Sequence, residues 1–296
     1  MPTGEPQPDV SAVETDLPVT LYSPESPLRH PVRLTGEILS DLWRCRELTW
    51  TLFTRDLKAQ YRQSYLGYIW IFVPVISTTI VWMFLNSSGV IRIENTSIPY
   101  PAYVLLGSVI WGVFNSSVNQ PLNSFNAGRQ VFMKLKVPPE AFVLSGLGNI
   151  AFETFIRMLV LIPVFVFLKM TPATTAWLFP IGIACVALIG LSIGFLMIPL
   201  GSLYSDVSRL AGTGLTFLMY LSAVVYPPPV DGWAAKIINW NPVTAMVMTT
   251  RDWLTLGHSS YLSAMLVTTG IALIVLFFGL IIFRVVMPHL IERMGM

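Results

Sequence analysis

Long apolar stretches separated by shorter polar ones fill the chain from residue 68 to residue 287. The hydrocarbon core of a bilayer, about 30 Å thick, needs about 20 helical residues to cross it, and six stretches reach or approach that length. This pattern predicts an all-α integral membrane protein with six transmembrane helices. The predicted spans cover residues 68–86, 102–118, 141–168, 177–204, 210–226 and 261–287.

A different pattern precedes the first span. Aromatic and apolar residues recur there at intervals of 3, 4, 4 and 4, which aligns them on one face of a helix, while Arg55, Lys58 and Arg62 lie off that face. Helices with an apolar side and a basic side lie in the membrane interface, so residues 37–65 are predicted as an amphipathic interface helix. Two roles stay open for it, a plain anchor and a contact with a cytoplasmic partner. The apolar stripe consists of Trp50, Phe53, Leu57, Tyr61 and Tyr65.

The segment between the fifth and sixth spans, residues 227–260, contains two short apolar pieces that meet at Asn241-Pro242. Each piece is too short to cross a bilayer. Irregular backbone at membrane depth survives only where protein buries it or where it lines a cavity. The segment is therefore predicted as a re-entrant helical hairpin that shapes an exit on the outer side. The alternative is a loop that lies on the membrane surface.

Composition supports the membrane prediction. Apolar residue types make up 54% of the 296 residues and charged types only 11%, whereas soluble domains carry about 25% charged residues. These values exclude an ordinary cytosolic enzyme and a disordered regulator. The net charge of +2 provides no bulk field to attract polyanions, so nucleic acid is not an expected partner.

The N-terminal region differs from the rest of the chain. Its first 30 residues contain six prolines and five acids, a composition that cannot bury enough apolar surface to fold. No basic segment followed by an apolar core marks a signal peptide. Residues 1–36 are therefore predicted as a disordered cytoplasmic tail. The interface helix and a six-helix permease domain over residues 66–290 follow it.

Basic residues predict the orientation, because cytoplasmic loops carry an excess of lysine and arginine. Thirteen of the 18 basic residues fall on the side of the two termini and four on the opposite side. Both termini are therefore predicted to be cytoplasmic. The larger group is Arg29, Arg33, Arg44, Arg46, Arg55, Lys58, Arg62, Arg129, Lys134, Lys136, Arg209, Arg284 and Arg293. The smaller group is Arg92, Lys169, Lys236 and Arg251.

Charged residues inside the spans are scarce. Glu153 and Arg157 in the third span are spaced i,i+4 with the glutamate on the N-terminal side, which is the order that favours an ion pair. An unpaired charge at the centre of a membrane helix costs about 2.5–3.5 kcal/mol on insertion scales. We therefore expect an intramembrane pair. It is either a structural pair that faces the bundle interior or part of a substrate passage.

The sequence contains no motif for binding ATP or for catalysis. It contains no phosphate-binding loop, no metal-ligand motif and no nucleophile motif. A secondary transporter needs ionisable groups within its spans, and a membrane-integral transferase needs clustered acids or a general base, so both are disfavoured. The chain is expected to be a non-enzymatic transport subunit that depends on a partner for ATP hydrolysis.

Several stretches occur in a recognisable order along the chain. They are Arg55-Asp56-Leu57-Lys58, Tyr61-Arg62-Gln63-Ser64 and Leu66-Gly67-Tyr68-Ile69-Trp70 with Pro74, then Phe132–Pro138, then Tyr204–Arg209, then Tyr226-Pro227 with Asn241-Pro242 and Arg251. In this order the chain resembles type-2 ABC exporter permeases, in particular the membrane subunit of the O-antigen, capsule and teichoic-acid polysaccharide exporters. The resemblance covers about residues 40–290 and aligns these stretches with the approach to span one, two cytoplasmic loops and the outward gate.

The resemblance implies a homodimer of this chain with two copies of a cytoplasmic ABC ATPase. It implies export of a lipid-linked polysaccharide, carried on undecaprenyl diphosphate, across the inner membrane. No cofactor is expected in this chain, because ATP and magnesium would bind to the partner subunit. The alternative within the same class is an exporter permease for a small lipid or a drug.

The expected site residues follow from this reading. Aromatic rings offer amphipathic surfaces to sugars, although lipid-facing belts and packing are the alternative for each ring. A segment with one apolar and one basic side before Pro138-Pro139 suits a knob in an ATPase cleft, with a loop resting on the bilayer as the alternative. The substrate path is assigned to Tyr68, Phe72, Trp82, Phe217 and Tyr220, and the basic entrance to Arg55, Lys58 and Arg62. ATPase coupling is assigned to Arg129, Phe132, Lys134, Lys136, Asp206 and Arg209.

Overall fold

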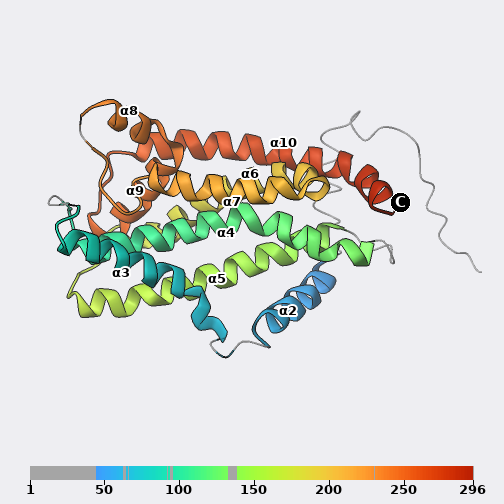
Figure 1. The fold of residues 1–296 in the computed structure, drawn as a ribbon, viewed down its shortest axis with the longest axis horizontal. Coiled ribbons are helices and arrows are strands. Elements are labelled where there is room, and N and C mark those ends of the chain that lie inside the picture. The colour runs from blue at the N-terminus through green and yellow to red at the C-terminus, as the bar shows by residue number, and fades with distance from the viewer. Residues whose placement is uncertain are drawn as a thin grey trace, which may run out of the picture. The chain divides into compact units, whose positions relative to one another are not determined.

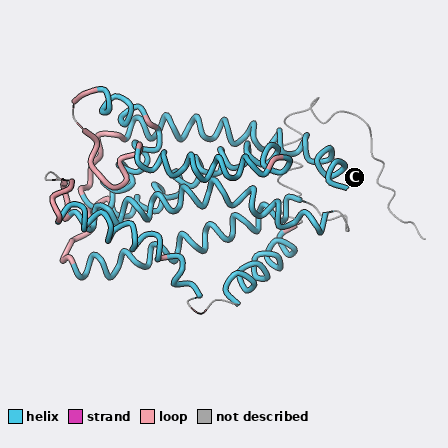
Figure 2. Tube along the Cα trace, in the orientation of Figure 1, coloured by secondary structure: helices cyan, strands magenta, loops and turns pink. Residues whose placement is uncertain are grey.

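The computed structural model describes residues 45–62, 65, 67–91, 93, 96–132, 139–229 and 231–295. These residues fall within one compact unit, residues 40–296. Every regular element in the described ranges is a helix, and no strand occurs among them (Figure 2). The all-α prediction is confirmed for this part of the chain.

The described residues contain nine α-helices and two short 3₁₀ helices. Four segments are long and apolar enough to cross a membrane, and they lie in α4, α5, α6 and α10. The other two predicted spans correspond to α3, which is apolar but has 15 residues, and to α7, which has 16. The α-helices are α2 (Arg46–Arg62), α3 (Val73–Ser87), α4 (Tyr100–Phe132), α5 (Pro139–Phe167), α6 (Phe179–Leu203), α7 (Ser205–Tyr220), α8 (Trp233–Trp240), α9 (Pro242–Thr255) and α10 (Leu262–Gly295). The 3₁₀ helices are η2 (Gly67–Ile71) and η3 (Ala176–Leu178).

The long helices lie side by side with α4 at the centre (Figure 1). It contacts α3, α5, α6, α7 and α9, and 72% of its apolar window is buried inside the protein. The helices α4, α6 and α10 run in one direction, and α3, α5 and α7 run in the other (Figure 1). We name the two ends of this bundle the α2 end, where α10 also terminates, and the α8–α9 end.

Glycines allow α6 to approach α4 closely. A Cβ atom on Gly190 would lie 2.6 Å from the Cβ of Ser117, and one on Gly194 would lie 2.7 Å from the carbonyl oxygen of Val118. Real Cβ atoms do not tolerate such distances. The small-xxx-small spacing of these two glycines therefore serves packing between helices of one chain.

The helix α4 continues well beyond the predicted end of the second span at residue 118. Polar residues after that point end the apolar run, but the next turns are buried in protein. Leu122 is 2% exposed and packs at Gly201, and Phe125 is 0% exposed and meets the ring of Phe283. The predicted span ended where the apolar run ends, because hydropathy reports which residues suit lipid. The helix continues further because α6 and α10 bury its second half.

The predicted interface helix is shorter than expected at its C-terminal end, because α2 stops at Arg62 and Tyr65 lies beyond it. Residues 37–44 lie outside the described residues. Trp50 of the apolar stripe is 67% exposed, whereas Phe53 of the same stripe packs on Gly148 and Phe152 of α5. Cys45 and Leu52, which the stripe does not contain, are also buried against the bundle. The stripe is therefore packed on protein in one part and exposed in another.

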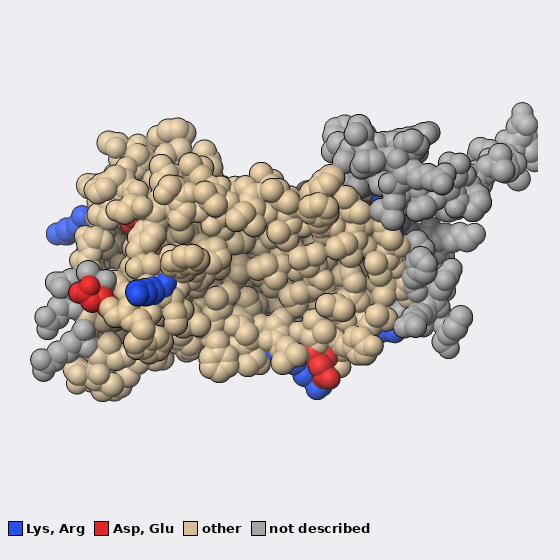
Figure 3. Space-filling model, turned by 90° about the horizontal axis from the view of Figure 1, so that it is seen from above, with Lys and Arg blue, Asp and Glu red and all other residues tan. Residues whose placement is uncertain are grey.

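On the face shown in Figure 3, charged side chains lie toward the two ends of the bundle and leave a broad uncharged band between them. Such a band matches the hydrocarbon core of a bilayer. Together with the four candidate spans, it shows a membrane protein.

Candidate functional site

The chain leaves the helical conformation at the α8–α9 end. The helix α7 stops at Tyr220, and residues 221–226 form an irregular turn, called the buried turn below. Four of its residues, 222–225, are completely shielded from solvent. A buried carbonyl without a partner costs free energy comparable to a lost hydrogen bond. The partners of the buried turn therefore decide whether it is stable.

Arg251 of α9 supplies the central partner. This residue is 1% exposed, and its Nη2 donates to the carbonyl oxygens of Val224 at 2.9 Å and Ala223 at 3.4 Å. The guanidinium carbon lies 3.6 Å from the centroid of the Tyr103 ring, which is the geometry of a cation–π contact. Arg251 therefore joins the buried turn to α4.

Three other side chains complete the support of the buried turn. They come from α4 and from the junction between α8 and α9, so elements far apart in the sequence converge on this one segment. Each donates to a different carbonyl oxygen. The contacts are Tyr100 hydroxyl to Val225 at 3.2 Å, Tyr103 hydroxyl to Tyr226 at 3.2 Å, and Asn241 Nδ2 to Leu221 at 2.9 Å.

The buried turn also depends on a glycine. A Cβ atom on Gly107 of α4 would lie 2.0 Å from the carbonyl oxygen of Val224 and 2.6 Å from Nη2 of Arg251. Within the buried turn, Ala223 adopts a φ of 48°, a conformation that residues with a side chain rarely adopt. A conformation of this kind persists where its surroundings fix it.

The start of α9 positions Arg251. Asn241 caps the helix, because its Oδ1 accepts a hydrogen bond from the backbone nitrogen of Val243 at 3.0 Å, and Pro242 suits the first helical position. One turn before the end of α9, Thr250 packs against Gly182 of α6. The Asn-Pro pair that predicted a break between two apolar pieces thus fixes the register of the buried arginine.

The neighbouring carboxyl group, Asp252, is 8% exposed. Burial raises its pKa above the ordinary value, while a hydrogen bond from Ser259 and the nearby Arg251 and His258 act in the opposite direction. No ion pair to Arg251 occurs among the described residues. Carbonyl oxygens, the Tyr103 ring and the thioether of Met248 surround the guanidinium instead.

The predicted intramembrane pair is present in α5. Nη2 of Arg157 lies 3.0 Å from Oε2 of Glu153. Both side chains dock on α4: the hydroxyl of Ser116 donates to Glu153 at 2.9 Å, and Nη1 of Arg157 donates to the carbonyl oxygen of Gly112 at 3.1 Å. The two charges are thus paired and also hydrogen-bonded to the central helix.

Two of the five aromatic residues assigned to a substrate path lie together. The ring centroids of Trp82 on α3 and Tyr220 on α7 are 6.5 Å apart, and Trp82 lies at the same distance from Tyr226 of the buried turn. Phe217, one turn earlier on α7, is 66% exposed. The ends of α3 and α7 therefore meet beside the buried turn.

The other aromatic residues of this set lie elsewhere. Tyr68, in η2, contacts the ring of Phe152 on α5 with centroids 5.5 Å apart. Phe72, between η2 and α3, is partly buried. The five rings consequently do not form a single cluster within one chain.

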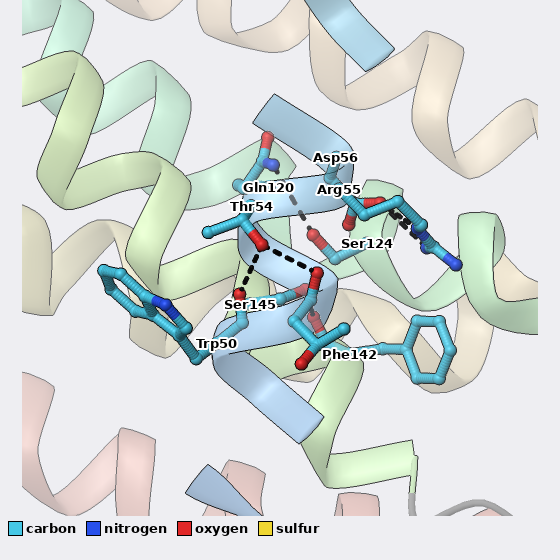
Figure 4. A network of polar contacts seen from close by, with 9 residues as sticks. Trp50, Thr54, Arg55, Asp56, Gln120, Ser124, Phe142 and Ser145 are labelled. Atoms are coloured by element: carbon cyan, nitrogen blue, oxygen red, sulfur yellow. Dashed lines mark hydrogen bonds and ion pairs between the residues drawn. The ribbon is translucent and has the colours of Figure 1, made fainter. Parts of the chain in front are cut away.

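The basic entrance residues Arg55, Lys58 and Arg62 are exposed on α2. Arg55 forms an ion pair with Asp56 at 2.8 Å on the side of α2 away from Trp50 (Figure 4). Exposed pairs of this kind contribute about 1 kcal/mol or less. An apolar groove of about 600 Å³ lies between α2 and α5, with Trp50 and Phe152 among its lining residues.

The residues assigned to ATPase coupling lie partly outside the described residues. Arg129 is exposed in the last turn of α4. Asp206 and Arg209 are 3.5 Å apart in the first turns of α7, with side chains 79% and 81% exposed. The side chain of Phe132 and all of Lys134 and Lys136 are not described.

Sequence reasoning missed Tyr100, Tyr103 and the buried turn itself. Hydropathy extends the fifth span to Tyr226 without interruption, so no local signal marks the end of α7. The signal that could have found the site is Arg251, because an arginine in an apolar segment needs several acceptors. Backbone carbonyls released from a helix can supply them.

Comparisons with known proteins agree with this architecture. Residues 47–254 match the family described as ABC-2 type transporter. The chain is 28% identical to the O-antigen export system permease protein RfbA of Klebsiella pneumoniae over 248 residues, which covers 80% of this chain and 91% of that protein. It is 20% identical to the polysialic acid transport protein KpsM of Escherichia coli, over 79% of this chain and 91% of that protein. The matched range begins within α2 and ends beyond Arg251, and the chain belongs to the ABC-2 type transporter family.

Proposed function

We propose that this chain is the permease subunit of an ATP-driven exporter that moves a lipid-linked polysaccharide, carried on undecaprenyl diphosphate, across the inner membrane. The observation that carries the proposal is the similarity to O-antigen and polysialic acid export permeases over about four fifths of the chain. The scarcity of charge in the bundle supports it, because a neutral path tolerates varied sugars.

The proposed topology has six spans. With about 1.5 Å of rise per residue, α3 alone covers about 22 Å, but η2 and α3 together approach the thickness of the hydrocarbon core. The buried turn extends α7 in the same way. The pair α8–α9 is proposed as a re-entrant hairpin, because the buried turn beside it is irregular backbone that only a protein interior stabilises.

The α2 end is assigned to the cytoplasm, because basic residues are concentrated there. This orientation places both termini in the cytoplasm. The proposed parts are a tail over residues 1–36, an interface helix, a permease domain over residues 66–290 and an outward gate over residues 227–260. Basic residues of the α2 end with described backbone are Arg46, Arg55, Lys58, Arg62, Arg129, Arg209 and Arg284.

The proposed assembly is a homodimer with two copies of a cytoplasmic ABC ATPase, which binds ATP and magnesium. The two short spans, α3 and α7, are mostly exposed in a single chain. A second copy of the chain would cover them. Sugars would pass along the exposed aromatic residues of these two helices, and the lipid diphosphate would meet the basic residues of α2.

The function is tested in a strain that lacks both this chain and its ATPase. Supplying the chain together with its ATPase should restore surface polysaccharide, whereas either subunit alone should not. Accumulation of lipid-linked polymer on the cytoplasmic side of the deletion strain would identify the blocked step. Normal surface polysaccharide in the strain without this chain would contradict the proposal.

Replacing Phe132 with aspartate should uncouple ATP hydrolysis from export. The physical reason is that a few aromatic residues often supply most of the binding energy of an interface, and a carboxylate cannot be buried there without a partner. ATPase activity and surface polysaccharide are measured at equal amounts of assembled complex, with Arg209→Gln near the start of α7 as a matched comparison. Parental export by the aspartate variant would assign coupling to Asp206 and Arg209.

Truncating Phe217 and Tyr220 to alanine should reduce export several-fold with little change in protein level. Both side chains are largely exposed in the single chain, at 66% and 47%, so truncation removes little packing. Phe278 on α10 is 56% exposed and provides the control, since Phe278→Ala removes a similar ring from a helix outside the proposed path. Equal export by all three variants would contradict a role in the substrate path and would assign these rings to contact with lipid.

A further inference from the structure

A second apolar groove, of about 450 Å³, lies beside the last turns of α5. Leu161 and Phe165 of α5 line one side, and Phe179 and Leu254, from the start of α6 and the end of α9, line the other. All of its lining side chains are apolar. None of them belongs to α3 or α7, so the groove is separate from the proposed substrate path.

The groove opens at membrane depth. It borders the candidate span Glu140–Phe167, of which only 17% of the apolar window is buried in protein. Ile162 and Val166, which also line it, are 62% and 72% exposed. Walls without polar groups do not retain water, and the volume is about three times that of a cavity that binds benzene. A hydrocarbon chain from the bilayer fits these conditions.

Contacts within the protein fix the walls of the groove, so the groove is preformed. Leu161 and Phe179 are each 5% exposed. The connection between α5 and α6 is tied to α9, because the backbone nitrogen of Ala173 donates to Leu254 at 3.0 Å and the hydroxyl of Thr175 donates to the carbonyl oxygen of Trp253 at 2.8 Å. A preformed groove binds without the free-energy cost of ordering its walls.

A lysine stands at the end of the groove. Lys169 is exposed and adopts a φ of 50°. The backbone nitrogen of Met170, which lines the groove, donates to Phe165 at 3.0 Å, and that of Lys169 donates to Val166 at 3.2 Å. This is the C-terminal capping pattern in which glycine usually takes the left-handed position. No carboxylate lies within ion-pair distance of Lys169 in the part of the chain that the structure describes.

We propose that the groove binds one acyl chain of an anionic glycerophospholipid in the leaflet at the α8–α9 end, with the phosphate of that lipid at Lys169. The span α5 ends at Phe167, so Lys169 follows at the level where headgroups begin, and a lysine near a membrane surface attracts anionic lipid. The bound chain also contacts Leu254, one turn after Arg251 on α9. Lipid occupancy therefore stabilises the helix that holds the buried turn.

The test is lipid retention by the assembled full-length transporter, measured by native mass spectrometry after exchange into equal amounts of dioleoyl phosphatidylglycerol and dioleoyl phosphatidylcholine. The parent should retain phosphatidylglycerol about fivefold more than phosphatidylcholine, since one lysine contributes about a fivefold preference. Ile162→Trp should fill the mouth and remove retention of both lipids. Lys169→Gln should keep retention and lose the preference, and Lys236→Gln, another exposed lysine at the same end, should change neither.

Lys169→Gly guards against a folding artefact, because glycine suits the left-handed backbone and removes only the charge. It should also lose the preference while the complex stays assembled. Parental retention in Ile162→Trp, or a preference that survives both Lys169 variants, would overturn the proposal. Displacement of phosphatidylglycerol by added undecaprenyl phosphate would show that the carrier lipid, not a phospholipid, is the occupant. Export is not measured, so the result is independent of the proposed function.

Discussion

Replacing Arg251 with methionine should abolish export and lower the stability of the assembled transporter. The substitution keeps an unbranched side chain of similar length but removes the donor for Val224 and the cation over the Tyr103 ring. Hydrogen bonds to charged groups contribute about 1.5–3 kcal/mol and a desolvated cation–π contact about 2 kcal/mol. The loss of a buried charge offsets part of this, so we expect a net cost of about 3 kcal/mol.

Three further variants separate the contributions. Arg251→Lys keeps the charge but cannot present a planar group to both the ring and the carbonyl oxygens, so it should restore little. Tyr103→Phe removes the hydroxyl and keeps the ring, whereas Tyr103→Leu removes both. We expect the leucine variant to be the less stable of the two if the cation–π contact dominates.

The measurements are the melting temperature of the purified complex and the surface polysaccharide of cells with matched protein levels. A methionine variant with parental stability and export would show that the buried turn does not need its arginine. A variant that is stable but does not export would instead assign Arg251 to the transport cycle itself. Both quantities are therefore needed from the same preparation.

Breaking the pair between Glu153 and Arg157 should have the second large effect. Removing one partner of a buried pair costs about 3–5 kcal/mol, because the remaining charge lies uncompensated in a low-dielectric environment. Glu153→Leu should therefore reduce the amount of folded protein in the membrane sharply. Arg157→Met should have a comparable effect, because in either variant the remaining charge keeps its hydrogen bonds to α4 but loses its counter-charge.

The double variant Glu153→Leu/Arg157→Met decides the role of the pair. Replacing a whole buried pair with apolar residues of similar size is often neutral, so a purely structural pair predicts recovery of both membrane level and export. A well-folded double variant without export would place the pair in the passage of substrate. The coupling free energy from the four melting temperatures measures the interaction directly.

The helix boundaries could be predicted from the sequence where a helix faces lipid, and less well where it packs against protein. The predicted spans at residues 141–168 and 177–204 coincide to within two residues with α5 and α6, since apolar composition ends where these helices end. α4 departs from its prediction because its second half is buried by protein despite polar residues. α7 departs in the opposite sense: its apolar run continues, but the helix stops.

The candidate site was predictable only in part. The sequence placed Tyr226, Asn241 and Arg251 in one region through their order, and the pair of short apolar pieces around Asn241-Pro242 appears as α8 and α9. What holds Arg251 depends on Tyr103, which lies 148 positions earlier. A contact at that separation has no periodic or compositional trace, since tyrosine at the start of a span also suits a membrane interface.

The length of α4 has a mechanical consequence. Its 33 residues form a rod of about 50 Å that carries Tyr103 near one end and Arg129 near the other. A helix resists stretching, so a push on its tip at the α2 end reaches the far tip as tilt or translation rather than as a change of length. Pro121 interrupts the backbone hydrogen bonding of this rod, and its ring packs where a side chain on Gly194 would stand. The rod can therefore bend most readily at Pro121, where it contacts α6.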